Sequence, residues 1–250
     1  MGVSIPHVML LASLWLVWAC AARWIAGNPK GDIPGGIAWL FLHPFTRLYH
    51  GLSVEGKERL PTRQEIAASG RPLIVVANHT AGVDPLLMQD VCGHRGGPRG
   101  FFIRWVMASH MRLPHYDFVW EWVGVIFVTT SPVPGRSGGE LLSVKEMIRH
   151  LRSGGVLGIF PEGGISEARG VLVPFKPGLG VLVAKTGARV LPLIIEGTAE
   201  GRTAWHSLLT PGRARVRVMP VLDYEGKPAA EIVADLQRRY QEWTGWRLGD

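Results

Sequence analysis

A histidine and an aspartate offer the first chemistry that this sequence suggests. His79 and Asp84 are separated by four residues, just after the apolar segment Leu73–Ala77. An imidazole has an ordinary pKa near neutrality, so it can take the proton of a hydroxyl group while that hydroxyl attacks an acyl carbon. A neighbouring carboxylate fixes the tautomer of such a histidine and stabilises the imidazolium that forms. We therefore interpret His79 as a candidate general base and Asp84 as its orienting carboxylate. The structural alternative is that Asp84 caps a helix beginning at Pro85.

A second polar group follows another apolar segment. Glu162 comes just after the expected strand Val156–Phe160 and before Gly163 and Gly164. A carboxylate at such a place can hydrogen-bond substrate hydroxyl groups or orient a cationic group, and the alternative is a solvated turn residue. A third segment, Val190–Ile195, has a proline near its start, which favours a strand at a sheet edge or bulge that lines an apolar slot.

The elements that must hold these side chains alternate between strands and helices. The expected strands are Leu52–Glu55, Leu73–Ala77, Gly100–Arg104, Val125–Val128, Val156–Phe160, Val190–Ile195 and Ala214–Met219. The expected helices are Thr62–Ser69, Pro85–Cys92, Tyr116–Val123, Gly138–Leu151, Gly178–Thr186 and Ala229–Trp246. This alternation predicts an α/β fold with a mixed sheet flanked by helices. Since His79 and Glu162 both follow an expected strand, we expect them on one rim of the sheet, where ligands of such folds gather.

The order of these segments resembles that of the glycerolipid acyltransferase family, whose best-known members are the 1-acylglycerol-3-phosphate (lysophosphatidate) acyltransferases. The family's His-x4-Asp block matches His79 and Asp84, preceded by Asn78 as expected. The matches to its Phe-Pro-Glu-Gly, Val-x-Pro-apolar and Phe-Lys-x-Gly blocks are Phe160, Pro161, Glu162 and Gly163; Val190, Pro192 and Leu193; and Phe175, Lys176 and Gly178. The resemblance runs from about Leu52 to Gly197, and it is the ordered set of blocks that makes it specific.

The resemblance implies an acyl transfer that needs no covalent acyl-enzyme. His79 takes the proton of the acceptor hydroxyl, whose oxygen attacks a fatty acyl thioester carried by coenzyme A or acyl carrier protein. The favoured acceptor is 1-acyl-sn-glycerol-3-phosphate, which gives phosphatidic acid. The resemblance also implies that Asn78, Glu162 and Gly163 bind substrate, and that no cofactor is needed beyond the acyl donor. Backbone N–H groups near the histidine, or a helix N-terminus, are expected to stabilise the oxyanion.

The basic residues with which the family binds the acceptor's phosphate are missing from their usual places. Thr129 follows Gly124–Val128 where the family has Asp-Arg. Gly164 and Ile165 replace Thr-Arg, and Met107 replaces a common lysine. Arginine binds phosphate through paired charge-assisted hydrogen bonds, so we expect other cations to substitute. The candidates are Arg104, Arg136 and Lys176, followed by Arg112 and Arg169.

These departures leave three alternatives open. The first is an acyltransferase for a different lyso-lipid or hydroxylated lipid acceptor. The second is a non-catalytic lipid-binding protein with a decayed site. The third is a lipid hydrolase in which His79 activates water, which would release free fatty acid when no lyso-lipid is present.

The N-terminal segment is strongly apolar. No Lys, Arg, Asp or Glu occurs before Arg23, and Ile5–Ala26 reaches the length of roughly 20 residues that a membrane span requires. We interpret residues 1–50 as a membrane-anchoring segment, spanning or lying in one leaflet, in which Ile37–Leu42 pairs with the first helix. A signal peptide and a buried core helix are the alternatives. Basic residues after the first apolar stretch favour an inner-membrane protein whose catalytic domain, residues 51–250, is cytoplasmic.

The composition limits the partners of the protein. Its 250 residues are 47% hydrophobic and 19% charged, with a formal net charge of +7. Basic charge suits an anionic membrane surface or phosphorylated substrates, whereas the scattered Lys and Arg predict no nucleic-acid partner. Two cysteines cannot form a disulfide framework, and the spacing of His94, His110 and His115 predicts no metal site. The expected partners are the bilayer, a lyso-lipid acceptor, and a coenzyme A or acyl carrier protein donor.

Overall fold

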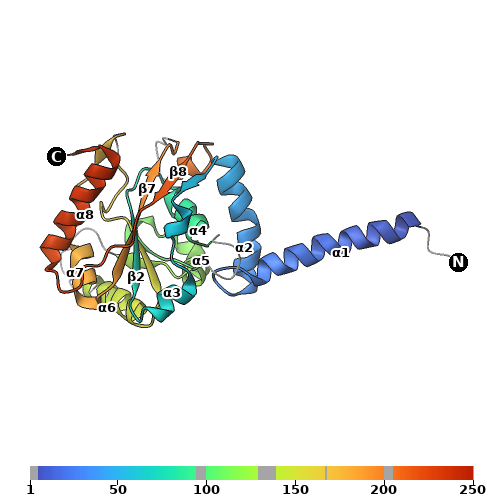
Figure 1. Ribbon diagram of the computed structural model, residues 1–250, viewed down its shortest axis with the longest axis horizontal. Helices are drawn as coiled ribbons and strands as arrows, with labels where there is room; N and C mark the ends of the chain where they lie inside the picture. The colour runs from blue at the N-terminus through green and yellow to red at the C-terminus, as the bar shows by residue number, and fades with distance from the viewer. Residues whose placement is uncertain (1–4, 94–99, 129–138, 167, 200–204, 250) are drawn as a thin grey trace.

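A seven-stranded mixed sheet forms the centre of the computed structural model, which describes residues 5–93, 100–128, 139–166, 168–199 and 205–249 (Figure 1). From edge to edge its strands are β1 (Ser53–Glu55), β8 (Arg215–Val218), β7 (Arg189–Glu196), β2 (Leu73–Ala77), β5 (Val156–Ile159), β3 (Arg104–Ala108) and β4 (Ile126–Val128). The β7–β8 pair is antiparallel and the other pairs are parallel. The α/β fold with a mixed sheet is therefore confirmed. The neighbouring strands β2, β5 and β7 end at one edge, here called the C-terminal rim.

Helices cover both faces of this sheet. The helices on one face are α3 (Arg63–Ala68) and α4 (Asp84–Gly93), and those on the other are α6 (Gly139–Arg152), α7 (Gly178–Thr186) and α8 (Ala229–Thr244). Side chains of β2 alternate between the two buried clusters, with Val75 on the α4 side and Ile74 and Val76 on the α8 side. Because both faces are covered, β2 is apolar along its whole length.

The amphipathic helix α8 belongs to the core. Ile232, Leu236 and Tyr240 are fully buried at helical spacing. The Tyr240 hydroxyl lies within hydrogen-bonding distance of the carbonyl oxygens of Val76 (2.9 Å) and Leu193 (3.0 Å). Burial raises the pKa of this hydroxyl well above its ordinary value. The helix therefore packs on the sheet directly beneath the C-terminal rim.

One expected strand is wrong in position, and two strands were not expected. The segment Gly100–Arg104 is not a strand, since β3 begins at Arg104. The backbone of the preceding apolar residues bonds to α4 instead: Phe101 N–H donates to the Cys92 carbonyl (3.2 Å), and Ile103 N–H donates to Gln89 Oε1 (3.0 Å). The unexpected strands, β6 (Val171–Leu172) and β9 (Arg247–Leu248), form a separate parallel pair.

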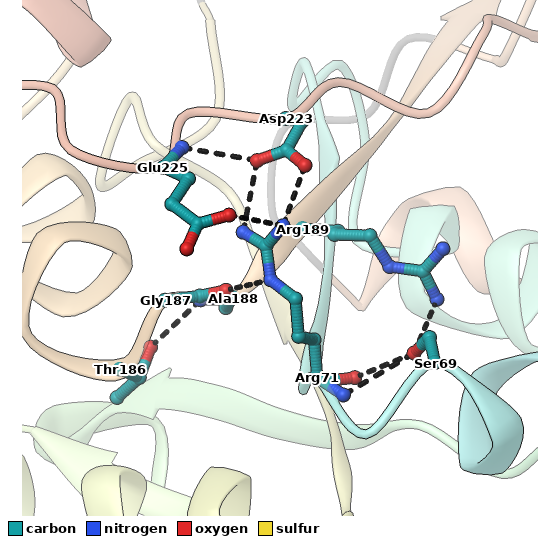
Figure 2. Close-up of polar contacts among 8 residues, drawn as sticks. All are labelled: Ser69, Arg71, Thr186, Gly187, Ala188, Arg189, Asp223 and Glu225. Atoms are coloured by element: carbon teal, nitrogen blue, oxygen red, sulfur yellow. Dashed lines mark hydrogen bonds and ion pairs between the residues drawn. The ribbon is translucent and has the colours of Figure 1, made fainter.

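The edge of the sheet opposite the C-terminal rim is held by an arginine-centred cluster (Figure 2). Arg71, just before β2, donates from Nε to the Gly187 carbonyl (3.0 Å) and from its guanidinium to Asp223 (2.8 Å). Arg189, the first residue of β7, donates to the Ser69 hydroxyl (2.9 Å). The α3–β2, α7–β7 and β8–α8 connections are thus joined where β2 and β7 begin.

Two apolar helices precede the α/β domain. Helix α1 (Ile5–Ala26) has no buried residue and projects from the domain, whereas α2 (Ile33–Pro44) packs beside α4 (Figure 1). A Cβ at Gly36 would lie 2.5 Å from the Ile25 side chain, so glycine permits the close approach of α1 and α2. A one-turn π-helix, Phe45–Tyr49, follows directly. The described part of the chain contains one helix long and apolar enough to cross a membrane, α1.

A buried carboxylate attaches this N-terminal part to the catalytic part. Asp90 on α4 is fully buried, and it accepts hydrogen bonds from His43 Nδ1 (2.8 Å) and Arg47 Nε (3.0 Å). A buried carboxylate of this kind requires such partners. The end of α2 is therefore fixed to the helix that carries Asp84.

Candidate active site

His79 and Asp84 meet at the C-terminal rim. The imidazole Nδ1 lies 2.9 Å from Asp84 Oδ2, and the Asp84 side chain is completely buried. The same carboxylate oxygen accepts the backbone N–H groups of Thr80 (2.6 Å) and Ala81 (2.8 Å). Asp84 is the first residue of α4, and it bonds to the turn before the helix rather than to the amides of the first helical turn. The carboxylate therefore closes the turn that carries His79.

This contact determines which nitrogen of His79 can act as a base. When Nδ1–H donates to Asp84, the lone pair of the neutral imidazole is on Nε2. The His79 side chain is 16% exposed. Its ring stacks on Phe160, with centroids 3.9 Å apart, and Phe160 stacks in turn on Trp105 at 5.6 Å. The arrangement holds the ring in one plane and leaves Nε2 as the basic atom.

Glu162 holds the histidine loop from its backbone side. Its carboxylate accepts the N–H groups of His79 (2.8 Å) and Val173 (2.9 Å), and the residue is 2% exposed. Burial raises the pKa of Glu162 to about 7. The sequence predicted a direct contact with substrate. The structure instead places this carboxylate between two backbone amides, where it positions His79.

Asn78 also faces inward. Its side-chain amide donates to the Ile195 carbonyl (2.9 Å) and accepts the Ile195 N–H (2.8 Å), and the residue is 1% exposed. It therefore joins the end of β2 to β7 rather than facing a substrate. Gly163 and Lys176 do lie together at the exposed surface of the rim. Gly163 has φ +75°, and the Lys176 side chain runs past it.

Of the arginines proposed for phosphate binding, Arg104 lies away from His79. Arg104 begins β3 and pairs in register with Leu157, which itself pairs with Ile74 near the start of β2. Its guanidinium bonds to Glu146 and to the Gly124 carbonyl. Strands rise about 3.3 Å per residue, so Arg104 lies well below the C-terminal rim, and its assignment to the acceptor site is not supported by this geometry. Arg136 lies outside the described residues.

Hydroxyl and aromatic residues of the site were missed by the sequence interpretation. The Thr80 hydroxyl lies 2.8 Å from that of Thr198, and Ser166 N–H donates to the His79 carbonyl (2.8 Å). Trp105 completes the aromatic stack. Of these residues, only Thr80 could have been found from the sequence, because it lies inside the His-x4-Asp block. The others come from strands and loops that are far apart in the chain.

An apolar cavity of about 560 Å³ adjoins this stack. It lies between α2, α4, β3 and α5 (Asp117–Val123), and Trp105 forms part of its wall. Its other apolar wall residues include Trp39, Phe41, Leu42, Phe45, Leu86, Met107, Trp120, Trp122 and Val125. A smaller pocket of about 250 Å³ is lined by Thr80, Thr198 and Arg169 among others. Among the described residues, no group of three His, Cys, Asp or Glu side chains is arranged to hold a metal ion.

The fold and the site define an α/β enzyme in which an aromatic stack runs from the His–Asp pair to the wall of an apolar cavity. Residues 51–196 match the family model described as Acyltransferase, and the chain belongs to this family of enzymes.

Its relatives include lysophosphatidate acyltransferases, as the sequence predicted. The 1-acyl-sn-glycerol-3-phosphate acyltransferase of Borreliella burgdorferi is 29% identical over 58% of this chain and 51% of that protein. The alpha form from Mus musculus is 26% identical over 78% of this chain and 63% of that protein. An N-acylphosphatidylethanolamine synthase of Arabidopsis thaliana is 25% identical over 73% of this chain and 64% of that protein. The chain thus spans between half and two thirds of these relatives.

The fold is also found in a solved structure. The crystal structure of the 1-acyl-sn-glycerophosphate (LPA) acyltransferase PlsC from Thermotoga maritima has a TM-score of 0.59 to this chain. The match covers 88% of this chain and 85% of that one, at 21% identity. The likeness extends beyond residues 51–196 and includes most of the architecture described above.

Proposed function

We propose that the protein transfers a fatty acyl group from acyl-coenzyme A or acyl carrier protein to the hydroxyl of a lyso-lipid. The favoured acceptor is 1-acyl-sn-glycerol-3-phosphate, and the product is then phosphatidic acid. The observation that carries the proposal is the His79–Asp84 contact of 2.9 Å at the rim, beside the aromatic stack that leads to the apolar cavity. The names of the relatives support the choice of acceptor.

The chemistry proceeds by general-base catalysis. Nε2 of His79 takes the acceptor's hydroxyl proton while the oxygen attacks the carbonyl carbon of the thioester. The buried Asp84 carboxylate stabilises the imidazolium that results. Collapse of the tetrahedral intermediate breaks the C–S bond, and the imidazolium returns its proton to the departing thiolate. General-base assistance of this kind is worth about 10²–10⁴-fold in rate.

The histidine loop does not supply the oxyanion donors from its first three amides. The N–H of His79 donates to Glu162, and those of Thr80 and Ala81 donate to Asp84. Donors for the oxyanion must therefore come from other backbone or side-chain groups near the rim.

The apolar cavity is the proposed site of the fatty acyl chain. Its volume of about 560 Å³ is within the range of about 300–1,000 Å³ that is usual for small-molecule sites. The wall contains tryptophan, phenylalanine and leucine side chains from α2, α4 and α5. A chain bound there would bring its thioester toward the His79 ring along Trp105 and Phe160.

We further propose that α1 anchors the enzyme in the inner membrane, with the catalytic domain on the cytoplasmic side. The 22 residues of α1 include no Lys, Arg, Asp or Glu before Arg23, and none of them is buried. The absence of burial argues against a core helix. Basic residues that follow the first apolar stretch support the proposed orientation.

Two observations favour a second candidate acceptor. The arginines with which the family binds phosphate are absent from their usual places, and one relative is named for the synthesis of N-acylphosphatidylethanolamine. A different lyso-lipid or hydroxylated lipid is therefore the second candidate acceptor.

One experiment separates these candidates. Purified full-length protein is incubated with acyl-coenzyme A or acyl carrier protein and a panel of lyso-lipids, and the products are identified by mass spectrometry beside His79→Ala. We expect a diacyl product that the variant does not form. Free fatty acid without acceptor would indicate a hydrolase. The absence of any product from the wild type would indicate a non-catalytic lipid-binding protein.

A further inference from the structure

Two segments that are distant in sequence expose large apolar side chains beside the C-terminal rim. One runs from α2 into the π-helix, and the other lies between β7 and β8. Together they form what we call the Leu48–Leu209 surface, which consists of Phe41 (72% exposed), Leu48 (83%), Tyr49 (40%), Trp205 (44%) and Leu209 (79%). Apolar side chains gathered in this way mark interaction sites more often than singly scattered ones do.

Specific contacts hold these two segments together. The Tyr49 hydroxyl donates to the Leu209 carbonyl (2.5 Å), and Ala214 N–H donates to the His50 carbonyl (2.9 Å). The Phe45 ring stacks on Tyr49 with centroids 5.6 Å apart and meets His50 edge-on at 4.7 Å. The backbone that carries Leu48 and Leu209 is therefore held by hydrogen bonds and ring packing.

The surface lies at the same edge of the sheet as the histidine. Strand β7 runs parallel to β2, so the β7–β8 connection leaves the sheet at the rim where His79 lies. The π-helix that follows α2 contacts the β7–β8 connection through Tyr49, and the start of α2 packs against α1 (Figure 1). The apolar surface of α1 thus continues through α2 to Leu48 and Leu209.

The apolar cavity reaches the same place. Phe41 and Phe45 both line the cavity, and Phe41 is also one of the most exposed side chains of the surface. The exposed Arg213 follows Leu209 closely in sequence and adds a positive charge that suits anionic lipid head groups. The cavity wall and the exposed surface therefore share the side chain of Phe41.

We infer that the Leu48–Leu209 surface rests on the lipid bilayer and forms a second membrane contact beside α1. The C-terminal rim and the cavity wall then face the lipid, which is where both the acceptor and the product reside. Interfacial binding of this kind increases with the apolar area buried in the head-group region. The inference rests on the proposed membrane association and adds the orientation of the catalytic domain.

Site-specific fluorescence tests this contact in the full-length protein. An environment-sensitive fluorophore is attached at Leu48→Cys or Leu209→Cys in a Cys20→Ser background, in which the remaining Cys92 is buried. The proteins are reconstituted with phosphatidylcholine–phosphatidylglycerol vesicles. We expect blue-shifted emission that iodide does not quench. The matched control is Leu142→Cys, whose parent side chain is 67% exposed on α6, at the far side of the domain from α1, and this label should remain in water.

The label on the native Cys20 of α1 separates two kinds of failure. If the Cys20 label reports lipid while the labels at positions 48 and 209 report water, the inference is overturned and the proposed anchor stands. If the Cys20 label also reports water, the proposed membrane association fails and the inference fails with it.

Activity gives an independent readout. We expect Leu209→Glu to reduce transfer to an acceptor embedded in vesicles by about tenfold, the order expected when one leucine no longer leaves water. Transfer to a short-chain acceptor dissolved in water should not change, and Leu142→Glu should behave like the wild type with both acceptors. A dimeric wild type that becomes monomeric in Leu209→Glu would assign the surface to a second copy of the chain and would overturn the inference.

Discussion

The backbone N–H of His79 donates to the Glu162 carboxylate at 2.8 Å, although the two residues are 83 positions apart in the sequence. The other oxygen of Glu162 accepts the Val173 N–H. The histidine is therefore held twice, at its backbone by Glu162 and at its ring by Asp84. Both carboxylates are almost completely buried. Each can therefore be essential without contacting the substrate.

Asp84→Asn should remove most of the activity. An amide in place of the carboxylate can favour the wrong tautomer of His79 and no longer stabilises the imidazolium. We expect kcat to fall by about 10²–10⁴-fold with little change in KM, as for the loss of a general base. Steady-state kinetics measure this. Asp90→Asn is the control, since Asp90 is equally buried on the same helix but bonds to His43 and Arg47. It should lower stability while the folded protein keeps its kcat. An Asp84→Asn enzyme with normal kcat would contradict the mechanism.

Glu162 should make the stability of the protein depend on pH. Burial raises its pKa to about 7 from an ordinary value of 4.5, so the folded state holds the proton more tightly than the unfolded state does. The contribution of protonated Glu162 to the free energy of unfolding is fully present below pH 4.5 and is lost as the pH rises through about 7. A shift of this size corresponds to roughly 3 kcal/mol across that window.

Urea unfolding of Glu162→Gln between these pH values checks the effect. The free energy of unfolding of the wild type should fall more steeply with rising pH than that of the variant. Glu55→Gln, whose parent side chain is 56% exposed, should keep the wild-type slope. Equal slopes for the wild type and Glu162→Gln would show that Glu162 does not titrate in this range.

Narrowing the apolar cavity should select against long acyl donors. Ala38 lines the cavity from α2, so Ala38→Trp reduces the space available to an acyl chain. We expect kcat/KM for long-chain acyl-coenzyme A or acyl carrier protein to fall by about tenfold or more, since about 1.4 kcal/mol of lost transition-state binding has that effect. Short-chain donors should react as before. The neighbouring Ile37 is exposed and is not part of the cavity wall, so Ile37→Trp should keep the wild-type preference. An equal fall in kcat/KM for donors of all chain lengths would contradict the assignment of this cavity to the acyl chain.

The arginine cluster of Figure 2 should matter for stability and not for catalysis. Arg71→Gln loses hydrogen bonds to the Gly187 carbonyl and to Asp223. We expect about 1–2 kcal/mol less free energy of unfolding, the usual value of such bonds at a partly exposed site. The cluster lies where β2 begins, at the edge opposite His79, so kcat should not change. Thermal unfolding and kinetics on the same preparation distinguish the two effects.

Much of the architecture could be predicted from local patterns. The apolar run of β2 and the block that ends at Asp84 placed a base and its carboxylate at the end of a strand, and the structure has them in contact. The alternation of strands and helices predicted the mixed sheet. These features depend on residues close together in the chain, where periodicity and spacing are direct consequences of backbone geometry.

The tertiary structure decided what surrounds those residues. Whether Glu162 and Asn78 face a ligand or the interior depends on the amides of Val173 and Ile195, which the sequence cannot place beside them. The register of β3 put Arg104 at the wrong edge for the acceptor, and four separate elements had to assemble before a cavity existed. Hydrogen-bond partners, desolvation and enclosed volume come from segments remote in the chain, and so they are fixed only when the sheet and its helices pack together.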